Sequence, residues 1–442
     1  MLFSLRGIVL FLWCCCSAAY AATTADLLEA LHLGDHARLA IMLRQGVNPN
    51  ERLADGSLPL AWAVDRQDVA AVRLLLEHDA WVDDPVAAGN PFRPLFVACL
   101  HPQPEIIALL LEAGADVNVR GADQVPALSP CAARAPVEIV AAMLERGALA
   151  DVADEFGQTP LMWAAQHGRE KIFALLLAAG ADLQRVSAGG FTATMFAVKS
   201  GHSGIAHAAL AAGGDRDRRT PDGSSLVQLA MYQSNYGIAK TLINEGADTQ
   251  AYDLNGRQLL HAAVLAGRPE LIQALLAAGA EVDARTKPSQ IKWRFESNFK
   301  AGSYEFPLSS PLLLAARDGD VGIMKQLIGA GADVTLEDSE GYTLLLAAAS
   351  SGVAEALQLA LNHSPEVNAA TRQGDTALHR VLASADGDSL EQMLQSLAAR
   401  GARIDIANAA GKTATDIAAG EHFKGRTAFV ANFPGVLVPQ LP

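Results

Sequence analysis

The chain has 442 residues, of which half are hydrophobic and only 6% are aromatic. This composition excludes a disordered polymer and is typical of a helical protein rich in alanine and leucine. The formal net charge of −14 repels phosphate backbones, so nucleic acid is not an expected partner. A chain of this length would ordinarily contain about three domains.

Residues 1–21 have the pattern of a signal peptide. Arg6 supplies the positive start, residues 7–16 form an apolar core, and residues 19–21 form a small-x-small cleavage site. We therefore expect cleavage after Ala21. The apolar core is too short to cross a bilayer, which requires about 20 residues, and no membrane span is expected elsewhere.

The leader predicts an exported protein, and its style together with the alanine-rich composition points to a bacterial periplasm. A lipid anchor on the cysteines at 14–16 is the alternative. It is disfavoured because Leu12 and Trp13 stand where small residues are expected.

Residues 154–184 form one complete unit of two helices. Thr159 and Pro160 begin the first helix, because the threonine hydroxyl caps free N–H groups and proline fits the first helical position. Gly168 ends that helix, and apolar residues then recur at helical spacing until Gly180 ends the second helix in a left-handed cap. Two helices this short must stack on neighbours.

The helix-ending glycine of this unit recurs along most of the chain. It stands at steps of 33 residues at Gly114, Gly147, Gly180, Gly213, Gly246 and Gly279. The series continues backward to Asp79 and Gly46 and forward to Gly331, Ser364 and Gly401, with a step of 52 between Gly279 and Gly331. A second glycine follows the same period at Gly157, Gly190, Gly223, Gly256, Gly341, Gly374 and Gly411.

A period of 33 with G-x-T-P-L and L-L-x-x-G-A-D resembles the ankyrin repeat. The resemblance implies an all-α solenoid of about twelve helix-turn-helix units over residues 22–433. It also implies a binding role, in which turn tips and first-helix ends form the concave, ligand-facing side. Residues 434–442 are expected to form an extended tail.

Cys99 and Cys131 are the cysteines that remain after cleavage, and they fall in the first helices of adjacent units. An oxidising compartment permits a bridge. Stacked helices lie about 8–10 Å apart, whereas a disulfide requires Cα atoms closer than about 7 Å. We therefore predict two unbridged core residues. Trp62 and Trp163, which occupy equivalent positions, are expected to fill the core between helices.

Five side chains at turn tips or first-helix ends are candidates for partner binding. By register with residues 154–184 they are Phe156, Phe191, Tyr232, Leu254 and Arg257. Large apolar residues are costly to expose unless a partner covers them. The alternative is that each of them folds onto its own neighbours.

The long step after Gly279 places an insertion at residues 285–308. Alternation of Trp293 and Phe295 with Arg294 and other charged residues predicts a strand, and a return strand is expected at Tyr304 and Phe306. Asn298 and Gly302 are expected in the bend between them. Trp293, Arg294 and Phe295 are further candidates for partner binding, since this extended hairpin must lean on the solenoid or on a partner.

No motif in the chain points to catalysis, a cofactor or a metal. Gly411, Lys412 and Thr413 resemble part of a phosphate loop, but Ile406 stands where that loop requires glycine. His261 and His379 follow the helix start, where ankyrin units often carry a histidine for local hydrogen bonding.

The sequence therefore predicts a non-catalytic scaffold that binds a protein partner in the periplasm. The partner surface would be the concave tips and the inserted finger. An accessory factor for an enzyme of that compartment and an immunity protein against one both fit. The alternatives are an enzyme whose site has no recognisable motif and a structural component of the envelope.

Overall fold

The computed structural model describes residues 24–53, 56–83, 93–289, 292–294, 301–303, 308–420 and 423–434. The chain divides between Asp182 and Leu183 into two compact units, here called unit 1 and unit 2. The predicted cleavage position Ala21 and most of the predicted tail lie outside the described residues.

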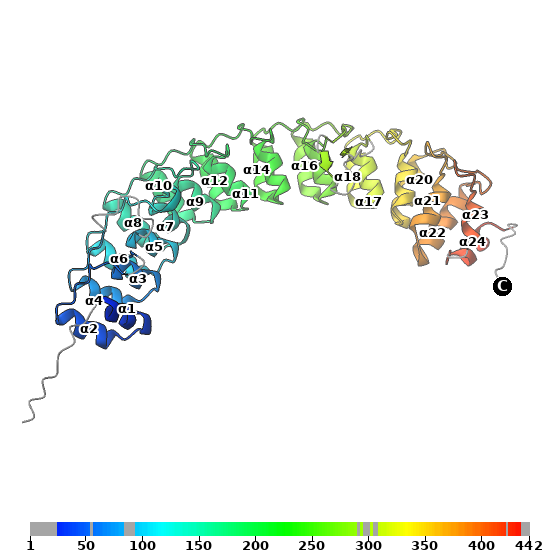
Figure 1. The fold of residues 1–442 in the computed structure, drawn as a ribbon. Helices are drawn as coiled ribbons and strands as arrows, with labels where there is room; N and C mark the ends of the chain where they lie inside the picture. Colours follow the sequence, from blue (N-terminus) through cyan, green and yellow to red (C-terminus); the bar gives the residue numbers. More distant parts are fainter. Residues whose placement is uncertain are drawn as a thin grey trace, which may run out of the picture. The chain divides into compact units, whose positions relative to one another are not determined.

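Unit 1 is a stack of helix pairs, each made of a first and a second helix (Figure 1). Its helices are α1 (Thr24–Leu33), α2 (His36–Arg44), α3 (Pro59–Asp65), α4 (Val69–Leu76), α5 (Pro94–Leu100), α6 (Pro104–Glu112), α7 (Leu128–Arg134), α8 (Val137–Glu145), α9 (Pro160–Gln166) and α10 (Glu170–Ala178), with the 3-10 turn η1 (Ala122–Gln124) before α7.

Unit 2 continues the same arrangement and adds a short hairpin. Its elements are α11 (Ala193–Lys199), α12 (Ser203–Ala211), α13 (Leu226–Tyr232), α14 (Tyr236–Asn244), α15 (Leu259–Leu265), α16 (Pro269–Ala277), β1 (Lys292–Arg294), β2 (Ala301–Ser303), α17 (Pro311–Asp318), α18 (Val321–Gly329), α19 (Leu344–Ser350), α20 (Ala354–His363), α21 (Ala377–Ser384), α22 (Gly387–Ala399), α23 (Ala414–Ala418) and α24 (Arg426–Asn432). The predicted all-α fold of about twelve pairs is confirmed.

The helices begin and end where their capping residues predict. The Thr159 side chain accepts a hydrogen bond from the Met162 N–H, and Pro160 occupies the first turn of α9. Gly180 follows α10 with φ of 88°, a left-handed conformation that favours glycine. Asp79 takes the same role with φ of 60°. Ser364 does not, because its backbone is extended at φ −116° and ψ 111°.

Polar side chains tie several of the caps to the preceding pair. In unit 1, the Asn50 side-chain amide donates to the Asp79 carbonyl at 2.9 Å, and the Asn118 amide donates to the Gly147 carbonyl at 3.1 Å. In unit 2, the Gln250 amide donates to the Gly279 carbonyl at 3.0 Å. These bonds satisfy backbone carbonyl groups of the turn that follows each second helix.

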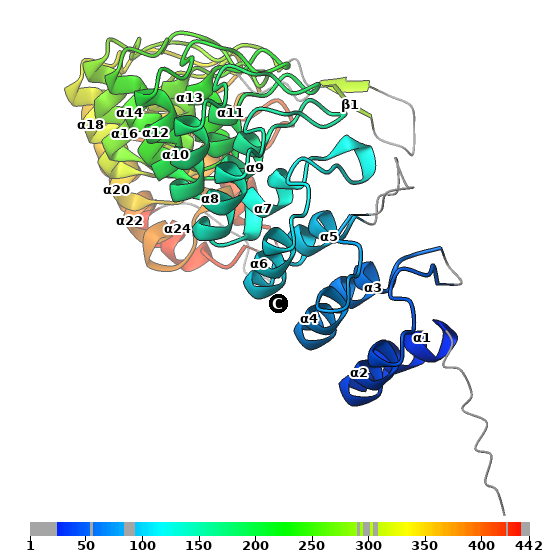
Figure 2. The same cartoon turned by 90° about the vertical axis from the view of Figure 1, so that its left-hand side faces the viewer.

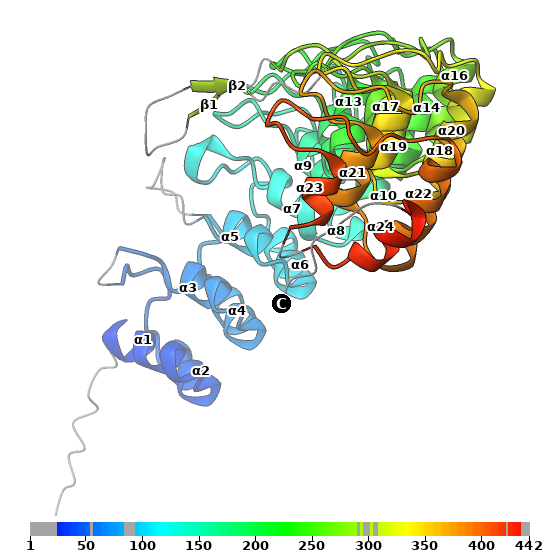
Figure 3. The ribbon, with the colours of Figure 1, turned by 90° about the vertical axis from the view of Figure 1, so that its right-hand side faces the viewer.

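The first helices carry much of the core and lie next to the turn tips. In unit 2, α13, α17 and α19 lie between the side from which the β1–β2 hairpin projects and the second helices α14, α18 and α20 (Figures 2 and 3). The interior is built from Leu, Ile, Val and Ala, and Phe173 and Phe429 are among its fully buried side chains. Exposed side chains of the first helices therefore share one surface with the tips.

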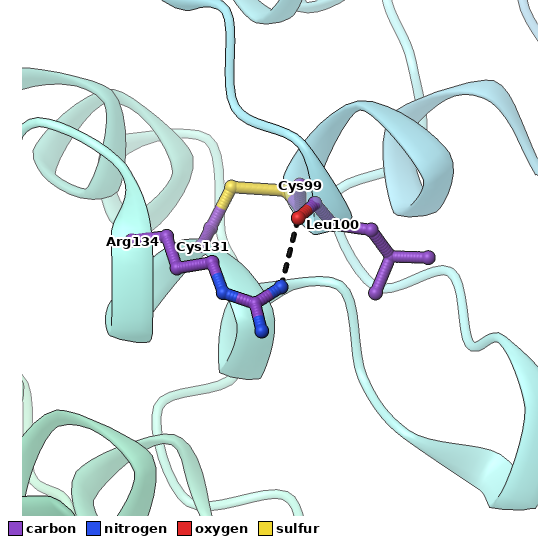
Figure 4. The surroundings of a disulfide bond; sticks show 4 residues. All are labelled: Cys99, Leu100, Cys131 and Arg134. Carbon is purple, nitrogen blue, oxygen red and sulfur yellow. Dashed lines mark hydrogen bonds between the residues drawn. A yellow bond between two sulfur atoms is a disulfide. The ribbon is translucent and has the colours of Figure 1, made fainter. Parts of the chain in front are cut away.

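The prediction that Cys99 and Cys131 are unbridged is wrong. They form a disulfide between α5 and α7, with Cα atoms 4.7 Å apart (Figure 4). The Arg134 guanidinium adds a hydrogen bond of 2.8 Å to the Leu100 carbonyl across the same pair of helices. The error arose because the distance between helix axes was used in place of the distance between facing residues, which is much shorter.

The inserted hairpin is present, with a register different from the predicted one. β1 pairs antiparallel with β2, and Trp293 lies opposite Gly302. Gly302 is thus in the return strand and not in the bend. Tyr304, Phe306 and Asn298 lie outside the described residues.

The base of the insertion keeps the geometry of an ordinary turn. The Thr286 N–H donates to the Ser309 carbonyl at 3.1 Å, as the Asp253 N–H donates to the Arg257 carbonyl at 2.8 Å one repeat earlier. The Lys287 N–H donates to the Gly256 carbonyl at 2.7 Å. A Cβ on Gly256 would lie 1.9 Å from the Lys287 carbonyl oxygen, so this contact requires glycine. The insertion therefore grows out of a turn tip that stays closed at its base.

Candidate functional site

The candidate site of each unit is its tip face, meaning the turn tips and the exposed side chains of the first helices. In unit 1 the tip face comprises residues 121–125 and 154–158 with Trp62 and Trp163. In unit 2 it comprises Phe191, Lys199, Tyr232, Asp253, Arg257, Arg317, Tyr342, Arg372 and Arg380.

Three of the described tips, which begin with Asp154, Asp253 and Asp338, are held by the carboxylate at their first position. Asp154 accepts hydrogen bonds from the N–H groups of Phe156 and Gln158 at 2.9 and 2.8 Å. Asp338 accepts from those of Glu340 and Tyr342 at 2.8 and 2.9 Å. The side chains of these tips therefore project from a backbone whose turn is fixed before any partner arrives.

Phe156 is displayed to solvent at the tip before α9. Its side chain is 57% exposed, the condition under which a partner would gain by covering it. Glu155, its neighbour, is also exposed.

The expectation that Trp62 and Trp163 fill the core is wrong. Both indoles are half-buried on the first-helix surface. His32 lies 5.6 Å from Trp62, and the Arg66 guanidinium covers that ring at 5.0 Å. His167 stacks on Trp163 at 6.0 Å with nearly parallel rings. In α3 and α9 the fourth residue lies on the helix surface, and the sequence pattern of apolar residues did not separate it from the core.

Phe191 is covered by its own neighbours in unit 2. Its ring lies 5.8 Å from the Phe196 ring, and the Lys199 ammonium group lies 5.0 Å from its centroid. A cation over an aromatic face is stabilising. The aromatic side chain remains on the tip face, but with an ammonium group as part of its surface.

Tyr232 and Arg257 are brought together by the fold. They line one shallow hollow with Asp253, whose carboxylate is buried. Partial burial raises the pKa of the Tyr232 hydroxyl, and the charge of Asp253 and a hydrogen bond to it raise that pKa further. Tyr232 is therefore a neutral donor that remains 46% exposed.

The remaining sequence candidates belong to the insertion and its base. Leu254 is half-buried, and its carbonyl accepts a hydrogen bond from the Ser289 hydroxyl at 3.3 Å. Trp293 and Arg294 lie in β1. Phe295 lies outside the described residues.

The most organised part of the tip face was missed by the sequence analysis. Tyr342 lies under two guanidinium groups, that of Arg317 at 4.8 Å from the ring centroid and that of Arg380 at 5.5 Å. A hollow of about 240 Å³ opens beside it, lined in part by Tyr342, Arg372 and Arg380. These residues come from three successive helix pairs of unit 2.

Arg317 is anchored by a buried carboxylate. Its Nη2 atom lies 2.8 Å from Asp338 Oδ2, and the Asp338 side chain has no exposed surface. Arg317 is the seventh residue of α17, as Tyr232 is of α13, and each interacts with the carboxylate 21 positions later. The register that singled out Tyr232 thus also pointed to Arg317.

His261 and His379 serve structure, as the sequence predicted. Both are buried, and their Nδ1 atoms accept hydrogen bonds from the backbone N–H groups of Gln258 and Thr376. In the described part of the chain, no three His, Cys, Asp or Glu side chains are grouped so as to hold a metal ion. None of the described helices has the length and hydrophobicity needed to cross a membrane.

Comparison with known proteins identifies the repeat. The chain matches the family model described as "Ankyrin repeats (3 copies)" over residues 27–121, 127–215, 194–286 and 312–408. It is also 32% identical over 114 residues to human "Ankyrin repeat domain-containing protein 63". That similarity spans 25% of this chain and 30% of the relative.

Proposed function

Because the chain belongs to the ankyrin-repeat family, in which stacked helix pairs present their turn tips, we propose that it is a non-catalytic scaffold that binds a protein partner in the periplasm. Each unit offers its own tip face for binding, and unit 2 also offers the finger at residues 285–308. The partner is an enzyme of that compartment, which the scaffold assists or inhibits.

The observation that carries this proposal is the arrangement of Arg317, Tyr342 and Arg380. Long arginine side chains normally lose conformational entropy when they bind. Here both guanidinium groups are already held over one ring, and Arg317 is also fixed by Asp338. Tyrosine and arginine are the residue types that dominate protein interfaces, and pre-ordering them lowers the cost of association.

The compartment is supported by two independent features. Residues 1–21 have the pattern of a secretory leader. The Cys99–Cys131 disulfide is of a kind that persists in oxidising compartments and is rare in the cytosol.

The test is capture of a partner from the periplasmic fraction of the source bacterium with the full mature chain. We expect one enzyme to be retained, and we expect its retention to be lost with the Arg372→Ala/Arg380→Ala variant. The control is Arg268→Ala, which removes a guanidinium from over Tyr236 at 4.4 Å, away from the tip face. Equal loss with the control would show that the tip face has no special role.

The finger has a separate test. Replacing residues 287–308 by the three residues 254–256 keeps the Thr286–Ser309 pairing and closes an ordinary turn. Capture that is unchanged by this replacement would remove the finger from the binding surface. If the wild-type chain retains no protein at all, the scaffold proposal fails and a structural role in the envelope is favoured.

A further inference from the structure

The turn tip at residues 121–125 differs from the ordinary tip that follows it at residues 154–158. In the tip at residues 121–125, Gln124 occupies the position that Gly157 holds in the next tip. Asp123 has φ 52° and ψ 28°, and Gln124 has φ 55°. Two successive residues other than glycine are thus left-handed, each at a cost of roughly 1–2 kcal/mol.

This strained tip is fixed by hydrogen bonds to its neighbour. The Asp123 carbonyl accepts from the Glu155 N–H at 3.0 Å. The Arg120 guanidinium donates to the carbonyls of Gln124 and Ala153, each at 3.2 Å. The two tips therefore form one rigid element. Strain of this kind persists only where surrounding contacts enforce it, and it is concentrated at functional sites.

The rigid pair of tips displays an exposed aromatic side chain and two exposed carboxylates, while the Arg120 guanidinium of the same pair donates to backbone carbonyls. Phe156 is 57% exposed, and Asp123 and Glu155, which are linked through the backbone bond above, are exposed as well. Phe191, the aromatic residue of a tip in unit 2, lies instead under the Lys199 ammonium group. The surface around Phe156 thus combines an uncovered ring with carboxylates that a cationic partner would complement.

We propose that residues 121–125 and 154–158 are the docking site for a basic, apolar segment of the partner protein. Phe156 enters an apolar pocket on the partner, and lysine or arginine side chains at the rim of that pocket meet Asp123 and Glu155. The inference rests on the proposed scaffold function and adds the chemical class of the partner surface.

The test uses a phage-displayed library of random peptides selected on the immobilised mature chain. We expect enriched peptides that carry lysine or arginine next to large apolar residues. Their binding should weaken about tenfold or more with Phe156→Ala, the loss typical of an aromatic anchor. It should also weaken, and depend less on salt, with Asp123→Asn/Glu155→Gln. Leu149→Ala is the matched control, because it removes another side chain of unit 1 that is 57% exposed but lies outside the tip face, and it should bind as the wild type does.

Several outcomes would overturn the inference. These are enrichment of acidic or uncharged peptides, equal binding by the Phe156→Ala variant, or no enrichment on the wild-type chain. Circular dichroism should show that all variants keep their helices, since Phe156 contributes little to the core. Peptides lost with Arg372→Ala/Arg380→Ala but retained by Phe156→Ala would overturn this docking site and leave the scaffold function standing.

Discussion

Both units carry aromatic side chains at their turn tips, but Phe156 precedes its tip glycine, whereas Phe191 and Tyr342 follow theirs. In unit 1, Phe156 is 57% exposed, and Asp123 and Glu155 of the same two tips are exposed as well. In unit 2, Phe191 lies under Lys199, and Tyr342 lies under two arginines. At the turn tips, one repeat geometry therefore supports an exposed ring in unit 1 and rings covered by cations in unit 2.

This difference distinguishes the positions that the repeat fold constrains from the positions at which residues can vary. Stacking requires the apolar positions and the caps, so these recur in both units. The seventh residue of a first helix contributes little to stacking and varies between units, as Gln166 and Arg317 illustrate. Binding specificity is thus encoded at positions that stability does not constrain. The units also differ in what stabilises them, which can be tested.

The largest expected effect is loss of the disulfide, which acts on unit 1 alone because unit 2 has no cysteine. Cys99→Ala/Cys131→Ala removes a crosslink between residues 32 apart, worth about 3.5 kcal/mol by chain entropy. Native-state hydrogen exchange should show faster opening of α5 to α8, with α13 to α20 unchanged.

The control for that experiment is reduction of the wild-type chain, which should reproduce the exchange pattern of the double variant. Equal destabilisation of both units would contradict their independent stability, since it would mean that the two units unfold as one. Unchanged exchange in α5 to α8 would mean that the disulfide adds no stability to its own unit.

The sequence predicted the framework well because its signals are local. The cap positions follow from the glycines that take positive φ, and Asp79, which stands 35 residues before Gly114, takes a positive φ as well. Ser364, which the spacing also selected, does not end its helix in a left-handed cap, because spacing cannot show that its backbone is extended. The disulfide was not predicted, because the distance between two helix axes does not give the distance between two facing Cα atoms.

The sequence predicted those residues of the candidate site that can be recognised one at a time from their position in the repeat. Phe156 could be selected from its own position in a turn. The cluster of Arg317, Tyr342 and Arg380 joins residues up to 63 positions apart, and its members meet only after three helix pairs have stacked. Side-chain direction, which decides whether a ring is covered or exposed, is set by those neighbours and not by the local pattern.

The second effect concerns pH and acts on unit 2. Burial lowers the pKa of His261 to about 4, although backbone acceptors at Ala284 and Ser309 partly oppose this shift. Its Nδ1 atom accepts from the Gln258 N–H, so protonation would break that bond. Because the unfolded chain binds the proton more tightly, this contribution to stability is complete above pH 6.5 and declines toward pH 4, by at most about 3 kcal/mol.

Urea unfolding of unit 2, followed by hydrogen exchange across this pH range, measures the effect. His261→Gln keeps a donor and an acceptor but cannot titrate, so its unfolding free energy should vary less between pH 6.5 and pH 4. A variant with the same pH profile as the wild type would show that other groups govern the response.

The smallest effect tests whether the tip at Gln124 is strained. Gln124→Gly should raise the stability of unit 1 by about 1 kcal/mol, because glycine adopts positive φ without the Cβ clash. The reciprocal change Gly157→Gln, at φ 69°, should lower it by a similar amount. Hydrogen exchange of α7 and α9 measures both changes in stability.

If Gln124→Gly leaves exchange unchanged, the tip is not strained. If stability rises while peptides bind less tightly, the strain serves to hold Asp123 and Glu155 in place, as expected when a binding surface retains a residue that folding alone would not favour.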